Sequence, residues 1–305
     1  MDWIARHPTA LAAAAALAIL WILEGLYPLF VHRRSRSAHG AQNISLGLIN
    51  AAVRVSFFPA ALVMVSATTE RHDFGLLRAA SLPSWGVAIA GVLLLDLAGY
   101  AWHVASHQWK WLWRFHAVHH HDDAVDSTTA FRFHLGDVLM GSLVTLTMVA
   151  LLGLQVWHVF LYEVLLVPLS IFHHGNIRIP ARLDRRLQRL IVTPRMHWVH
   201  HSQWVKETDS NYAPIFSFWD RLFGTFRERR DSRRIRFGLQ GYDTKDHATL
   251  RGCLTTPLGR IKSMPGWDTA RAAPSHAHTT PPPDVVVVTN GATPDPTPAT
   301  QHIAR

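Results

Sequence analysis

The 305-residue sequence has a single cysteine, Cys253, and this scarcity excludes several kinds of site. A disulfide within the chain, an iron–sulfur cluster held by this chain alone and a thiolate zinc site all need more than one thiol. Charged residues are also few, at 17% of the chain against 49% hydrophobic residues. That balance is unusual for a soluble protein of this length. We therefore expect an integral membrane protein.

Acidic residues are in deficit, with 21 Asp and Glu against 30 Lys and Arg and a formal net charge of +9. A nucleic-acid-binding surface would gather such charges on one soluble face with aromatic residues between them. Here they flank apolar runs and fill the last third of the chain. Anionic lipid headgroups are therefore the expected partner, and nucleic acid is not.

The apolar residues form runs long enough to cross a bilayer, since about 20 of them span the hydrocarbon core. Single spans are expected over about 9–31, 44–67 and 84–106, and an apolar helical hairpin over about 137–172, by the same length rule. The expected fold is all-α: a multi-span membrane helical bundle with a cytoplasmic helical cap that carries the histidines. Because the hairpin returns to the side it left, the histidines before and after it would lie at one membrane face.

The first apolar run is alanine-rich and also fits a signal peptide. Only Arg6 precedes the run, however, whereas Arg33, Arg34 and Arg36 follow it, and no small-residue cleavage pattern appears. We favour a membrane anchor whose arginine end is cytoplasmic. Further along, residues 181–191 alternate leucines and arginines as an amphipathic helix on the cytoplasmic leaflet would.

Histidine is abundant, and 13 of the 21 histidines fall between positions 103 and 201. Residues three or four apart share a face of a helix, so this spacing aligns the histidines of one HxxxH and two HxxHH groups. The same geometry turns His121 away from its neighbours, and we predict that it is not a ligand. Eight or more histidines exceed what one ion of four to six ligands can use, which predicts two metal ions. Imidazole suits iron, zinc, copper and nickel alike, so the ligand type does not name the metal.

In combination these groups resemble the fatty acid hydroxylase and sterol desaturase superfamily of integral membrane, non-haem di-iron enzymes. The resemblance covers about residues 82–227. It is carried by these further matches: Asp96 and Tyr100 before His103, Arg132-Phe133-His134, Phe172-His173-His174-Gly175-Asn176, Thr193-Pro194-Arg195-Met196-His197, Asp209-Ser210-Asn211-Tyr212 and Phe218-Trp219-Asp220 through Thr225.

The resemblance implies which residues bind iron. The implied ligands are His103, His107, His116, His119, His120, His174, His197, His200 and His201. His173 then takes the neighbouring variable position. His134 departs from the family pattern, because Leu135-Gly136-Asp137 follows it where the family has Pro-Leu-Glu. It either ligates iron or hydrogen-bonds to a ligand.

Four further residues are candidate catalytic residues: Asp96, Asn176, Asn211 and Tyr212. Their polar groups could hold ligand histidines or groups derived from O2. The alternative for Asp96 is a hydrogen bond to a neighbouring helix, since a carboxylate within a membrane is costly. For the other three the alternative is a turn or capping contact.

By resemblance, the protein uses two iron ions, O2 and two electrons to remove hydrogen from a C–H bond of a lipid, giving an alcohol or, after a second removal, a double bond. The sequence lacks the His-Pro-Gly-Gly motif of a fused cytochrome b5 domain, so we expect a separate electron-transfer protein. The expected location is a bacterial inner membrane, with the histidines on the cytoplasmic side. A membrane metal transporter is an alternative, although it would place ligands near the bilayer midplane. A haem carrier would use only two of the histidines.

The sequence divides into four expected regions. Residues 1–81 form an N-terminal membrane anchor with two spanning helices, and 82–230 form a fatty acid hydroxylase-like di-iron catalytic domain. A C-terminal extension covers 231–267. Residues 268–305 are rich in Pro, Thr and Ala and are expected to be a disordered tail.

Overall fold

The computed structural model describes residues 8–30, 35–229, 231–242, 247–260 and 285–286. Nearly all of its regular structure is helical, which confirms the all-α prediction. The expected disordered tail lies outside the described residues, except that strand β2 (Val285–Val286) pairs antiparallel with β1 (Glu228–Arg229).

Among the described residues, five helices are long and apolar enough to cross a membrane. This confirms a multi-span membrane bundle. The long helices are α2 (Pro8–Leu26), α3 (Arg36–Arg71), α5 (Ser84–Gln108), α7 (Leu135–Leu152) and α8 (Val156–His174).

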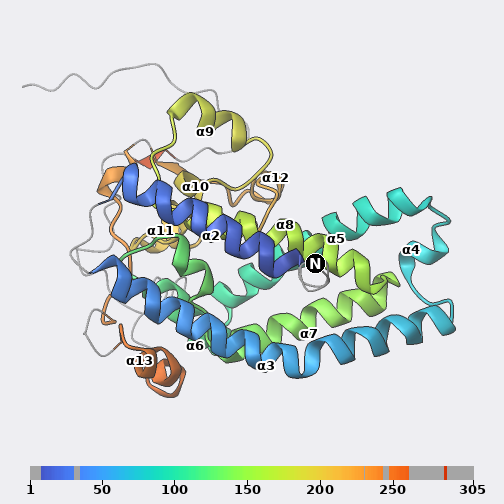
Figure 1. Ribbon diagram of the computed structural model, residues 1–305. Helices are drawn as coiled ribbons and strands as arrows, with labels where there is room; N and C mark the ends of the chain where they lie inside the picture. The colour runs from blue at the N-terminus through green and yellow to red at the C-terminus, as the bar shows by residue number, and fades with distance from the viewer. Residues whose placement is uncertain (1–7, 31–34, 230, 243–246, 261–284, 287–305) are drawn as a thin grey trace, which may run out of the picture.

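Figure 1 shows α3, α5, α7 and α8 running alongside one another, with α4 (Leu76–Ala79) at one end of the bundle. At this end the chain turns between α7 and α8 at Gly153, whose φ of 71° suits glycine. A Cβ on Gly75 would lie 2.3 Å from the Cα of Gly153, so the two loops touch through backbone alone.

The short elements that follow the long helices gather mostly at the opposite end, where α9, α10, α11 and α13 are seen in Figure 1. They form the cap of the bundle. The cap contains α6 (Lys110–His120), η1 (Ser127–Phe131), α9 (Ala181–Leu187), α10 (Pro194–His200), α11 (Val205–Thr208), α12 (Phe218–Leu222), η2 (Ser232–Arg234), α13 (Leu250–Thr255) and η3 (Thr256–Leu258).

Helix α3 is longer than the sequence predicted. At 1.5 Å per residue its 36 residues extend over about 54 Å, whereas the hydrocarbon core of a bilayer is about 30 Å thick. Its first turns carry the buried polar residues His39 and Asn43, which bond to the cap. The sequence prediction began at residue 44 because the polar residues before it interrupt the apolar run.

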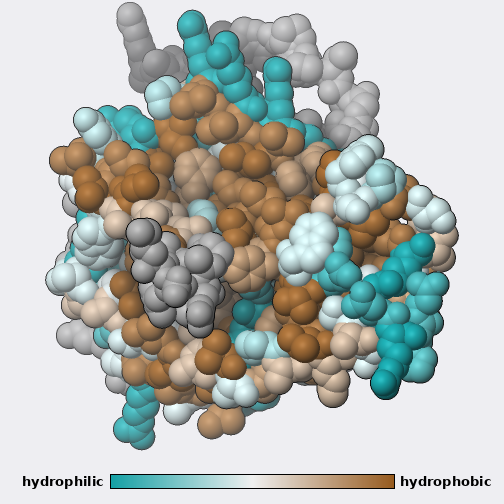
Figure 2. All heavy atoms as spheres, turned by 45° about the vertical axis from the view of Figure 1, so that its right-hand side comes forward, coloured by the Kyte–Doolittle hydropathy of each residue, from teal (hydrophilic) through white to brown (hydrophobic). Residues whose placement is uncertain are grey.

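The two N-terminal helices pack directly on the rest of the bundle, α2 along α8 and α3 along α7. Leu20 of α2, Ile171 of α8 and Ile177 form one buried cluster. Many large apolar side chains of the long helices are nevertheless exposed, among them Leu48, Val55 and Leu143. Figure 2 shows a broad hydrophobic area on this surface, as expected of helices that face lipid.

Candidate metal centre

Among the described residues, nine histidines converge into two groups at the cap end of the bundle. Within each group the possible ligand atoms lie within 4.8 Å of one another. The group of five contains His103, His107, His116, His120 and His200. The group of four contains His119, His174, His197 and His201. All nine were named from the sequence.

Each HxxHH motif contributes to both groups. On α6, His116 and His120 join the group of five and His119 joins the group of four. On α10 and its C-terminal cap, His197 and His201 join the group of four and His200 joins the group of five. Successive helical residues point about 100° apart, so adjacent histidines of one motif diverge enough to join different groups. Helices α6 and α10 therefore each supply both groups.

The nitrogen spacing fits metal coordination. Two nitrogens that bind one ion at about 2.1 Å and at right angles are about 3.0 Å apart. In the group of four, Nε2 of His174 lies 3.1 Å from Nε2 of His119 and 3.0 Å from that of His197. In the group of five, the Nε2 atoms of His107 and His120 are 3.1 Å apart. The residues present thus fit two neighbouring metal ions.

The outer nitrogens of several rings are held by hydrogen bonds. Three rings donate from Nδ1 to a backbone carbonyl at 2.7 Å: His103 to that of Tyr212, His174 to that of Ser170, and His200 to that of Ser210. Nδ1 of His116 donates to Asp137 at 2.8 Å. A proton fixed on Nδ1 leaves Nε2 bare, which is the form that binds metal.

Burial also keeps the cap histidines neutral. It lowers the pKa of His119, His120, His197, His200 and His201 well below the ordinary value, because charging a ring away from water is costly. Neighbouring histidines lower these values further. Neutral imidazoles do not have to lose a proton before they bind a metal.

Three of the histidines that the sequence analysis considered lie outside both groups. His121 contacts Arg132 at 3.1 Å and stacks on Tyr242, in keeping with its predicted exclusion. The ring of His173 packs at a tilt against that of His197, with centroids 4.1 Å apart, but His173 belongs to neither group. The possible ligand His134 is not brought to the centre either. It caps α7, with Nδ1 accepting from the Gly136 amide and Nε2 facing the Leu254 carbonyl, so both of its nitrogens are engaged elsewhere.

Three of the four candidate catalytic residues hold backbone in place. Asp96 accepts from the amides of Ile215 and Phe216 and from the indole of Trp219, at 3.0 to 3.1 Å. Only the bond from Trp219 comes from a helix, as the alternative for Asp96 expected; the two amides belong to the segment that follows Tyr212, which Asp96 positions.

The two asparagines have similar roles. Asn176 accepts from the amides of Leu29 and Phe30 and donates to the Phe30 carbonyl. Asn211, at a φ of 54°, joins Met196 to Arg227 through three hydrogen bonds. Asparagine tolerates this left-handed conformation better than most residues.

Tyr212 is the one candidate catalytic residue whose side chain lies against the histidines. Its ring packs edge-on to those of His103 and His107, with centroids 5.5 and 5.1 Å apart, and contacts His200 in the same way. Its backbone carbonyl accepts from Nδ1 of His103. Tyr212 therefore helps to fix the group of five.

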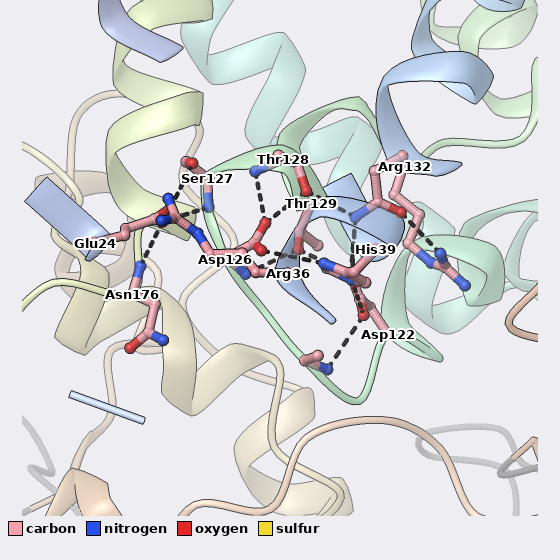
Figure 3. A network of polar contacts seen from close by, with 12 residues as sticks. Glu24, Arg36, His39, Asp122, Asp126, Ser127, Thr128, Thr129, Arg132 and Asn176 are labelled. Carbon is pink, nitrogen blue, oxygen red and sulfur yellow. Dashed lines mark hydrogen bonds and ion pairs between the residues drawn. The ribbon is translucent and has the colours of Figure 1, made fainter. Parts of the chain in front are cut away.

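A buried polar network, absent from the sequence predictions, braces the centre from outside (Figure 3). Glu24 of α2 accepts from the amide and hydroxyl of Ser127 and from the Asn176 amide. His39 of α3 lies between Asp122 and Asp126, at 2.9 and 3.1 Å.

This network ties α2 and α3 to the loop after α6 and to the residues after α8. Helices α6 and α8 themselves carry ligand candidates. One sequence signal was available: Glu24 is a carboxylate inside an apolar run, which is costly unless it is paired.

A cavity of about 500 Å³ extends from the histidines into the bundle. His103, His116, His119, His174 and His197 line it. The rest of its wall comes mainly from α3, α5, α7 and α8, with apolar residues such as Leu95, Met148 and Leu166. An apolar chain lying in this cavity would reach both histidine groups.

Membrane-length helices and two buried histidine groups beside an apolar cavity define an integral membrane protein with sites that could bind metal. Residues 88–225 match the family model described as fatty acid hydroxylase, in agreement with the resemblance that the motifs predicted. The chain is 28% identical to cholesterol 25-hydroxylase of Rattus norvegicus, over 52% of this chain and 53% of that protein.

Two other relatives match at similar levels. Identity is 29% to the ornithine lipid hydroxylase OlsE of Rhizobium tropici, over 50% of this chain and 45% of that one. Identity is 30% to alkylglycerol monooxygenase of Danio rerio, over 51% of this chain and 33% of that protein. The chain spans about half the length of the first of these curated relatives. No solved structure matches it significantly.

Proposed function

We propose that the protein is a membrane-bound non-haem di-iron oxygenase that hydroxylates a C–H bond of a lipid. One observation carries the proposal: two groups of histidines, whose possible ligand atoms lie within 4.8 Å of one another in each group, stand at the end of an apolar cavity within a membrane-length bundle. Relatives that are hydroxylases and monooxygenases acting on sterol, ornithine lipid and alkylglycerol support the same reaction class.

The group of five and the group of four would each hold one iron ion. When bound, the two ions would supply the activation of O2 that removal of hydrogen from an unactivated carbon requires. The chain's own residues have three tasks. Carbonyls and Asp137 keep protons on the outer ring nitrogens, the cavity wall holds one carbon of the lipid near the histidines, and apolar side chains exclude water.

Hydroxylation and desaturation both begin with loss of one hydrogen, and the names of the relatives favour hydroxylation. A metal transporter is less well supported, because the histidines cluster at one end of the bundle and do not follow a path across it. We also propose that residues 82–230 form the catalytic domain, that 1–81 anchor it, and that 231–267 form a C-terminal extension.

The histidine end would face the cytoplasm, since Arg36, which follows the first span, pairs with Glu24 at that end. Electrons would come from a separate electron-transfer protein. The exposed arginines of the α9 region, Arg182, Arg185, Arg186 and Arg189, offer a basic surface for an acidic partner.

The test is to purify the full chain from iron-supplemented cells, measure its metal content and incubate it with O2, a chemical or protein reductant and extracted membrane lipids. We expect about two irons per chain, no haem absorption band and a lipid product that is heavier by one oxygen atom. A chain that binds zinc alone, or leaves every lipid unchanged when it is fully loaded with iron, would contradict the proposal.

A further inference from the structure

The cavity contains an ion pair well away from the histidines. Arg54 of α3 donates to the carboxylate of Glu163 on α8, and its Nε lies 3.3 Å from the hydroxyl of Ser142 on α7. All three residues line the cavity. Glu163 precedes His174 by eleven residues on α8, which separates them by about 16 Å along the helix axis.

The pair is costly where it stands. Arg54 and Glu163 both lie within membrane-length helices, where charged side chains are expensive and often mark a functional site. Here the side chains are 31% and 21% exposed and line the space that the histidines also line.

A second polar residue lies on the same face of α3. Asn50 precedes Arg54 by about one helical turn and lines the same cavity. Its Nδ2 donates to the Phe133 carbonyl at 2.7 Å, whereas its buried Oδ1 has no hydrogen-bond partner among the described residues. Phe133 in turn stacks on His119 with ring centroids 4.2 Å apart. Polar groups therefore line the cavity at two depths, near the histidines and further inside.

We propose that Arg54 and Glu163 bind a hydroxyl group of the lipid substrate and so set which carbon reaches the histidines. This inference rests on the proposed function of the cavity. A hydroxyl can donate to the Glu163 carboxylate and accept from the Arg54 guanidinium at once, without separating the pair. A carboxylate or phosphate would have to displace Glu163 from Arg54 and leave a charge unpaired in apolar surroundings. The substrate class is therefore a neutral lipid alcohol.

The position of the pair also determines the orientation of the substrate. A hydroxyl held at Glu163 places the oxidised carbon about 16 Å away along α8, at the depth of His174. The lipid would then lie with its hydroxyl inside the bundle and its other end at the cap. Arg54 also packs on the Phe58 ring at 3.9 Å, which limits its movement and keeps the binding group in place.

The test measures binding and does not require turnover. Purified full-length protein in nanodiscs is equilibrated with radiolabelled 1-hexadecanol or with hexadecyl methyl ether, which cannot donate a hydrogen bond. The test variant combines Arg54→Met with Glu163→Met, because replacing both partners by apolar residues avoids leaving one charge alone. The control variant, Arg78→Met with Glu70→Met, makes the same changes at a charged pair outside the cavity.

We expect the wild type and the control variant to retain the alcohol about tenfold more than the ether, as for a hydrogen bond to a charged group. The test variant should lose this preference while keeping its helix content. An equal preference in the test variant, or none in the wild type, would overturn the inference. If the wild type prefers the alcohol but iron-loaded protein oxidises no lipid, the binding inference stands and the proposed function fails.

Discussion

Replacing His119 by alanine should remove one metal ion and leave the other. His119 belongs to the group of four, and its Nε2 lies 3.1 Å from that of His174. The variant leaves three histidines there and does not touch the group of five. Loss of a residue that merely orients a ligand weakens metal binding about 10- to 100-fold, and loss of the ligand itself should cost more. We therefore expect bound iron to fall from about two ions per chain to about one.

The measurement is elemental mass spectrometry on protein purified from iron-supplemented membranes, with circular dichroism to confirm that the helices remain. His121→Ala is the matched control, because His121 is buried and close in the chain but lies outside both groups. It should keep both ions, and turnover should be lost only in the His119 variant. Two ions retained by His119→Ala, or one lost by His121→Ala, would refute the division of α6 between two sites.

Three further changes probe other parts of the site. Asp137→Ala removes the acceptor behind His116 and should weaken iron binding in the group of five about 10- to 100-fold, measured by competition with a chelator. Gly141 lines the cavity, and a Cβ added there meets only Trp102, at an ordinary contact distance of 3.7 Å. Gly141→Leu should therefore fit the fold but obstruct the cavity, which lowers lipid turnover without loss of iron. Unchanged turnover would show that the lipid lies elsewhere. Asp96→Ala leaves three donors unpaired at roughly 1 to 3 kcal/mol each, so thermal unfolding should occur at a clearly lower temperature, while Asp96→Asn should lose less.

The spans and the shared helix face of the HxxxH and HxxHH histidines could be predicted because both follow from local spacing, whereas His174 was named from the family resemblance alone. Apolar runs of sufficient length appear as long helices, and histidines three or four apart share a helix face whatever surrounds the helix. The division of each HxxHH motif between two groups could not be predicted in this way. It depends on where α10 lies relative to α6, and nothing within either motif specifies that position.

The polar residues were harder to assign from sequence. Asp96, Asn176 and Asn211 occupy family motifs, yet they bond to backbone groups outside their own motifs, so only the folded structure shows what they hold. His134 resembled a ligand because it follows Arg132 and Phe133, but its place as the cap of α7 engages both of its nitrogens. The Arg54 and Glu163 pair joins residues 109 positions apart, and neither residue stands in a recognisable motif.

The carboxylate of Glu24 has a consequence for biosynthesis. It belongs to α2, the first helix among the described residues, yet its partners Ser127 and Asn176 flank segments that are synthesised more than a hundred residues later. During translation Glu24 therefore lacks these two partners until the later helices have been made and inserted. A fragment starting at residue 82 would lack this acceptor, and its newly made cap should fail to mature into an iron-loaded form.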